Sequence, residues 1–176
     1  MKHDAASGAF QATKTLPHKD SFCSHRFDNA FYADCFSRQT ASAPFDSALS
    51  CYLSMTAKAP GWVNGLLRLR DRMVVPLGMN PTHGFRAQEL DSPIVTKGDR
   101  LDFFTVASIS PRELELQLDD RHFTVSISIY LSAHPPAQRL YITSMVNPAS
   151  RVGKVYVSLI APFHRAVVKT LLNRLG

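Results

Sequence analysis

The feature that most constrains the fold is the alternation of apolar and polar residues on both sides of Asp119-Asp120, between Glu113 and Leu131. A period of two is typical of strands with one buried face. We therefore predict two strands, Glu113–Leu118 and Arg121–Leu131, joined as a hairpin at Asp119 and Asp120. The apolar face of this hairpin consists of Leu114, Leu116, Leu118, Phe123, Val125, Ile127 and Ile129. Such a face requires a second layer to cover it.

The last segment, Val152–Leu172, has a helical period and is the best candidate for that layer. With successive residues about 100° apart, nearly all of its circumference is apolar. One narrow polar stripe remains, made of Lys154, Ser158, Arg165 and Lys169. We expect the sheet to surround this helix and Pro162 to bend it.

The other elements follow from capping residues and breaks in periodicity. In chain order they are a strand at Phe31–Gln39, a helix capped by Ser42 with the stripe Phe45, Ala48, Leu49 and Tyr52, a helix from Pro60 and Trp62 to Pro76, and strands at Leu101–Ile109 and Leu140–Val146. The fold class is therefore predicted as α+β. A curved antiparallel sheet of about six strands holds a long C-terminal helix, and two helices are inserted after the first strand.

The composition narrows the classes of protein. The chain has 176 residues and a net charge of +6. We expect residues 1–20 to form a mobile polar tail and residues 21–176 to form a single domain. No apolar run has the length of a signal-peptide core or of a transmembrane helix. Three cysteines without a CxxC pair predict reduced thiols and a cytoplasmic protein.

Several kinds of site are disfavoured. The sequence contains no GxGxxG, P-loop, GxSxG or HExxH motif, and its seven histidines are dispersed. We therefore expect no cofactor and no metal ion. The aromatic residues follow core positions and the cations are scattered, which argues against nucleic-acid binding.

Three groups of polar residues break the apolar patterns. Arg70 falls near the middle of the apolar arc of the second helix, so it is either a structural ion pair or an anchor for an anionic ligand. The turn Asp120-Arg121-His122 is either a hydrated hairpin turn or an acid–base cluster, with Arg121 on the core side. His164 flanks the buried arc of the last helix and is the best general-base candidate, whereas Arg165 lies on the polar stripe.

The order of several short motifs resembles a known family. They are Pro60-Gly61-Trp62, Leu69-Arg70-Asp71, Pro76-Leu77-Gly78, Asp120-Arg121-His122, Gly153-Lys154-Val155-Tyr156 and Pro162-Phe163-His164-Arg165. From about Asp28 to the C-terminus the chain resembles the bacterial family called domain of unknown function 2867, which is related to the START-like, helix-grip superfamily. The resemblance implies a cavity between a curved sheet and the last helix. It also adds weight to Arg70, Asp120, Arg121, His122, His164 and Arg165 as site residues.

Three functions remain open. The first is binding of a small apolar or amphipathic molecule, with Arg70, Arg121 or Arg165 at its polar end. The cavity wall would then be formed by Trp62, Phe103, Phe123, Ile127, Tyr156 and Phe163. The second is a scaffold with a filled core, which would associate as a homodimer through an apolar contact. The third is an enzyme that uses His164 or His122 as general base, oriented by Asp120, in the same cavity.

Overall fold

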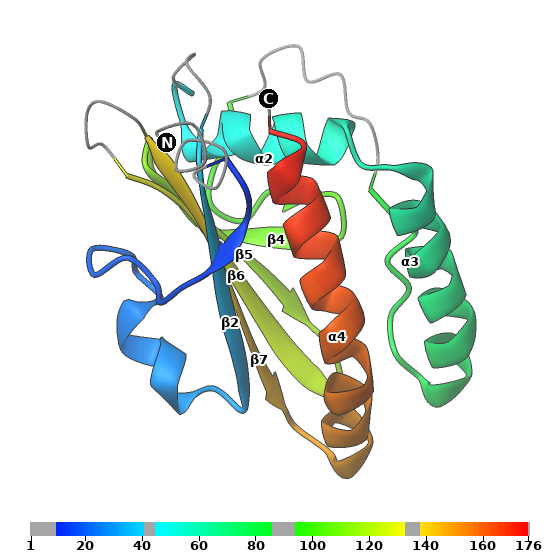
Figure 1. Ribbon diagram of the computed structural model, residues 1–176. Helices are drawn as coiled ribbons and strands as arrows, with labels where there is room; N and C mark the ends of the chain where they lie inside the picture. The colour runs from blue at the N-terminus through cyan, green and yellow to red at the C-terminus, as the bar shows by residue number, and fades with distance from the viewer. Residues whose placement is uncertain (1–9, 41–44, 86–93, 133–137, 176) are drawn as a thin grey trace, which may run out of the picture.

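The computed structural model describes residues 10–40, 45–85, 94–132 and 138–175 (Figure 1). A sheet with one long helix, α4, in front of it dominates the fold. The helical elements are η1 (Ser24–Asn29), α2 (Ala48–Ala57), α3 (Gly61–Val74), η2 (Val75–Leu77) and α4 (Arg151–Asn173). The strands are β1 (Thr13–Lys14), β2 (Tyr32–Gln39), β3 (Arg100–Leu101), β4 (Phe104–Ile109), β5 (Glu113–Asp119), β6 (Phe123–Leu131) and β7 (Arg139–Pro148). The α+β class is confirmed.

The strands form one open antiparallel sheet in the order β1-β2-β7-β6-β5-β4-β3. Seven strands replace the expected six, and two of them contain only two residues. Asp102 has a φ of 54° and interrupts the strand predicted at Leu101–Ile109. Residues Thr13–Lys14, inside the segment predicted as a tail, pair with β2 at Ser37 and Phe36.

The predicted hairpin is confirmed, with Leu116 opposite Ile127 and Leu118 opposite Val125. The prediction that Arg121 begins the second strand is wrong, because β6 begins at Phe123. The Asp120 carboxylate accepts a hydrogen bond from the backbone N–H of His122 at 3.0 Å, and this closes a wider turn. Arg121 is exposed as a consequence, since it lies outside the alternating pattern.

The two inserted helices are present. Ser42 lies outside the described residues, and α2 begins instead after Ser47, whose hydroxyl accepts from the backbone N–H of Ser50 at 3.1 Å. The second predicted helix corresponds to α3 and η2. Gly78 ends it in the left-handed region with a φ of 78°.

The bounds predicted for α4 are correct to one residue at each end, but the prediction that nearly all its apolar surface is buried is wrong. Val157, Ala161 and Val168 lie buried on one face, whereas Val155 is 70% exposed and Leu159 is 62% exposed. The helix contacts β2 and β7 along a single side, so a wide apolar arc exceeds what the sheet can cover. Among the helices of the described ranges, α4 alone is long and apolar enough to cross a membrane, a criterion that core helices of soluble proteins also meet.

The opposite face of β5 and β6 is covered by the segment before β2. Glu113 is 2% exposed, and its carboxylate accepts hydrogen bonds from Ser21 and Ser128 at 2.6 Å each and from the backbone N–H of Phe22. Arg26 forms an ion pair with Glu115 on the same face. Cys23, Cys35 and Cys51 are buried free thiols.

Candidate functional site

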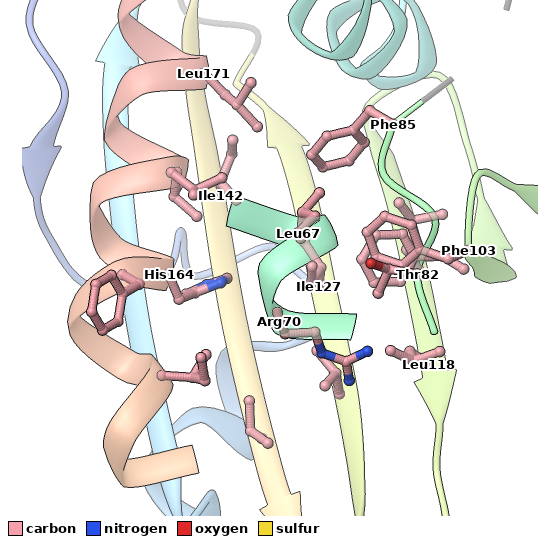
Figure 2. Close-up of a pocket in the computed structure, with 18 of the residues that line it drawn as sticks. Leu67, Arg70, Thr82, Phe85, Phe103, Leu118, Ile127, Ile142, His164 and Leu171 are labelled. Atoms are coloured by element: carbon pink, nitrogen blue, oxygen red, sulfur yellow. The ribbon is translucent and has the colours of Figure 1, made fainter. Parts of the chain in front are cut away.

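A mostly apolar pocket of about 210 Å³ lies between α3, α4 and the sheet (Figure 2). Its wall includes Leu67 of α3, Phe103, Ile127 of β6, Ile142 of β7 and Leu171 of α4. Strands β4–β7 turn apolar side chains toward α4, and α3 stands beside α4 (Figure 1). Residues from all of these elements line the pocket. An apolar cavity of about 150 Å³ can bind benzene, so this one has room for one ring and a short substituent.

Arg70 forms the polar end of this pocket on the α3 side. Its side chain is 6% exposed and makes three hydrogen bonds. Nε donates to the hydroxyl of Tyr156 at 2.8 Å, and Nη1 donates to Asp71 at 3.0 Å and to the backbone oxygen of Asn80 at 2.6 Å. Within the described ranges no hydrogen bond uses Nη2, which therefore remains a donor for a ligand.

Asp71 connects Arg70 to the loop after η2. Its carboxylate accepts from the backbone N–H groups of Thr82 at 2.9 Å and His83 at 2.8 Å, and also from the Thr82 hydroxyl. Burial disfavours the ionised carboxyl, but the hydrogen bonds from Thr82, His83 and Arg70 outweigh this and lower the pKa of Asp71. The ion pair predicted as one reading of Arg70 is therefore present, and Arg70 also lines the pocket.

A second polar group forms the wall on the α4 side. Asp34 of β2 lies directly opposite Ser144 of β7 in the sheet, and α4 places His164 over both. His164 Nε2 is 2.9 Å from Ser144 Oγ and 3.9 Å from Asp34 Oδ1. Tyr32 donates its hydroxyl to Asp34, and Arg165 Nε is 3.7 Å from the same carboxylate. We call these five residues the Asp34 cluster.

Two members of the Asp34 cluster, Tyr32 and His164, line the pocket itself. Figure 2 shows the ring of His164 directed from α4 toward the pocket, with Arg70 on the opposite side. Asp34 is 1% exposed, and its Oδ1 has no hydrogen-bond partner among the described residues. Burial raises the pKa of Tyr32, and the neighbouring Asp34 adds to this effect. The cluster thus brings an imidazole and a phenol to the edge of an apolar space.

Burial lowers the pKa of His164, although the Asp34 carboxylate opposes the shift and Arg165 reinforces it. The folded state therefore favours the neutral ring, and the unfolded state binds the proton more readily below its ordinary pKa of about 6.5. We expect the contribution of His164 to the free energy of unfolding to be fully present above that value and to fall as the pH decreases through it toward the lower folded pKa.

The His164→Gln variant should lose less stability than the parent between about pH 7.5 and pH 5.5 in urea unfolding. The exposed His25 supplies the matched control, His25→Gln. Equal losses in His164→Gln and the parent would contradict this prediction.

The structure does not bring the predicted turn residues into the pocket. The Asp120 carboxylate accepts from the backbone N–H of Asn80 at 2.7 Å. The ring of His122 lies 2.8 Å from Ser150 Oγ and 3.2 Å from the backbone oxygen of Leu77. Asp120, Arg121 and His122 are absent from the pocket lining, and so is Trp62, which is 49% exposed. The acidic neighbour of His164 is Asp34 and not Asp120.

The other predicted wall residues, Phe103, Phe123, Ile127, Tyr156 and Phe163, do line the pocket. Sequence reasoning missed Asp34, Ser144 and Tyr32. The one available signal was a charged residue inside a predicted strand, since Asp34 lies between Ala33 and Cys35. Within the described part of the chain, no group of three or more His, Cys, Asp or Glu side chains could hold a metal ion.

Comparisons with known proteins give one result. Neither the curated proteins nor the solved structures contain a match to this chain. The sequence model of the family described as protein of unknown function (DUF2867) matches residues 26–171, which include both polar ends of the pocket. The chain therefore belongs to this family.

Proposed function

We propose that the protein binds a small, largely apolar molecule carrying one polar or anionic group in the pocket between α3, α4 and the sheet. The observation that carries this proposal is the buried Arg70, whose Nη2 is unused among the described residues at the end of an apolar cavity. Apolar walls with a few fixed polar groups are typical of ligand sites. The cavity also favours binding over a scaffold function, which requires a filled core.

The same architecture supports two finer assignments. We infer a helix-grip, START-like fold, because an open antiparallel sheet packs against a C-terminal helix with a pocket between them. We infer a cytoplasmic location from the three free thiols. We propose that residues 21–176 form a single domain, supported by the continuous run of strands from β2 to β7, to which Thr13–Lys14 adds a short edge strand.

Filling the pocket should weaken binding. Val167 lines the cavity, so Val167→Phe is expected to weaken binding of phenylacetate, a ring with one carboxylate, at least about tenfold. Val155→Phe makes the same change at a 70% exposed position of α4 and should bind like the parent. Amide chemical shifts followed by NMR during titration measure both affinities. Native mass spectrometry of freshly purified protein reports any ligand carried from the cell.

Two results would overturn the binding proposal. One is a clean apo mass together with no phenylacetate-induced shifts at Arg70, Tyr156 or Val167. The other is equal affinity of Val167→Phe and Val155→Phe, which would place the bound molecule outside the pocket.

The Asp34 cluster favours one alternative, an enzyme in which His164 acts as general base on a ligand bound in the same pocket. The neutral imidazole touches Ser144 and lies near a buried carboxylate, as proton abstraction requires. In D₂O the mass of a co-purified ligand would then rise with time in the parent protein, because each abstracted proton is replaced by a deuteron from solvent, and would stay constant in His164→Gln. A constant ligand mass in both the parent and His164→Gln would contradict the enzyme alternative and leave only the binding proposal.

A further inference from the structure

The mouth of the pocket is bordered by exposed apolar side chains on both helices. On α3, Leu69 is 53% exposed and Met73 is 49% exposed. On α4, Leu159 is 62% exposed and Phe163 is 48% exposed. Groups of exposed apolar side chains beside a pocket mark sites of interaction with proteins or membranes. We call this surface, together with Trp62 and Val155, the α3–α4 face.

Helical geometry makes the α3–α4 face continuous with the pocket. Leu66 and Arg70 of α3 line the cavity, and Leu69 and Met73 lie one turn away on the adjoining side of the same helix. On α4 Phe163 both lines the pocket and reaches solvent, and Leu159 lies one turn before it on the same side of the helix. The apolar interior thus extends outward onto both edges of the opening.

The charges beside this surface are almost all positive. Exposed cations lie on α3 at Arg68 and Arg72 and on α4 at Arg151. Lys154 and Lys169 lie on the flank of α4 toward β2, where their ammonium groups sit over the rings of Phe31 and Phe36. The sequence of α4 contains no Asp or Glu, and the one acid of α3, Asp71, is bound to Arg70 and the following loop. The acids Glu113 and Glu115 lie on the other face of the sheet, paired with the N-terminal segment.

These charges decide between two occupants of the α3–α4 face. A second copy of the chain, placed across a two-fold axis, would bring the same cations of both copies together, and like charges oppose such contacts. An anionic lipid surface neutralises the cations while its acyl boundary accepts the apolar side chains. The helix α4 would lie on the membrane without spanning it, since Val157, Ala161 and Val168 pack inside the fold.

We propose that the α3–α4 face docks on an anionic membrane surface, with the mouth of the pocket turned toward the lipid. Docking requires only the exposed side chains of the two helices, so it holds whether or not the pocket carries a ligand. If both proposals are correct, the ligand reaches the pocket from the membrane without crossing water.

Vesicle co-sedimentation tests the docking surface. The parent protein should bind phosphatidylcholine vesicles containing about one third phosphatidylglycerol and should not bind pure phosphatidylcholine. The double variant Arg68→Gln/Arg72→Gln removes two exposed cations of α3, and binding should weaken about 30-fold. Lys14→Gln/Lys19→Gln removes the same charge from the N-terminal segment and should bind like the parent. Leu159→Gln should also weaken binding, without loss of the folded circular dichroism spectrum.

Three outcomes would overturn docking. Equal losses in the two double variants would mean that net charge alone attracts the vesicles. Equal binding to both kinds of vesicle would exclude the anionic lipid. A dimer in sedimentation velocity that Leu159→Gln dissociates would make the α3–α4 face a self-association surface. The phenylacetate titration is independent of all three, so failure of docking and failure of ligand binding can be told apart.

Discussion

Gly153→Ala is expected to lower the free energy of unfolding by about 3 kcal/mol, which is more than most single substitutions cost. A Cβ atom at Gly153 would lie 2.1 Å from the backbone oxygen of His122 and 3.3 Å from Cβ of Pro148. That oxygen already accepts a hydrogen bond from the backbone N–H of Ala149 at 2.8 Å. Because the obstacle is backbone, the first turn of α4 must move away from the end of the hairpin.

Gly65→Ala is the control for this prediction, because the same methyl group is added within a helix. At Gly65 of α3 a Cβ atom meets nothing within 4 Å, so the alanine should raise stability by about 0.5–1 kcal/mol. Urea unfolding of the two variants measures effects of opposite sign. A Gly153→Ala protein as stable as the parent would show that α4 and the hairpin do not approach as closely as described.

Arg70→Met is expected to lower the free energy of unfolding by about 2–4 kcal/mol. The substitution keeps the apolar stem and removes a buried cation that connects Asp71, Asn80 and Tyr156. Asp71 keeps its hydrogen bonds from Thr82 and His83, so the loss should be smaller than for a stranded carboxylate. Arg72→Met, at an exposed position of the same helix, should change stability by less than about 0.5 kcal/mol.

Ligand binding separates the two roles of Arg70. If Nη2 holds the polar group of the ligand, Arg70→Met should lose affinity for phenylacetate but keep affinity for toluene, which has the ring without the carboxylate. Unfolding of both variants in urea and NMR titration below the unfolding transition supply the two measurements. Parallel losses for phenylacetate and toluene would mean that Arg70 shapes the pocket and does not bind the anion.

The parts of the fold that sequence predicted well have strong periodicity. The alternation around Leu116 and Ile127 sets the hairpin register, and the apolar period of Val152–Leu172 gives α4 to within one residue. The strand Thr13–Lys14 is too short to show a period in the sequence. It is a strand because it pairs with β2, which is distant in the chain. The start of β6 differs from the prediction because the Asp120 carboxylate accepts from the backbone N–H of His122 and holds residues 120–122 in a turn.

The candidate site was only partly predictable, for a physical reason. A helical wheel reveals that Arg70 is out of place, but it cannot tell which apolar surfaces of α4 find a partner. The expectation that the sheet surrounds α4 therefore missed the exposure of Leu159 and Phe163. Asp34 becomes part of a polar cluster only in the folded chain, where β7 places Ser144 beside it and α4 places His164 over both. Contacts of that kind depend on segments distant in sequence, and no local pattern contains them.

The strand order determines at which point of synthesis the sheet can be completed and covered by α4. Strand β2 is made early but pairs with β7, which leaves the ribosome after all of β3–β6. Arg38 of β2 also donates to the backbone oxygen of Leu172 at 2.6 Å, near the end of α4. Non-local pairing of this kind slows folding and leaves apolar strand faces uncovered meanwhile. A nascent chain that stops before α4 should therefore aggregate or engage chaperones, and the fold can close only after α4 has left the ribosome.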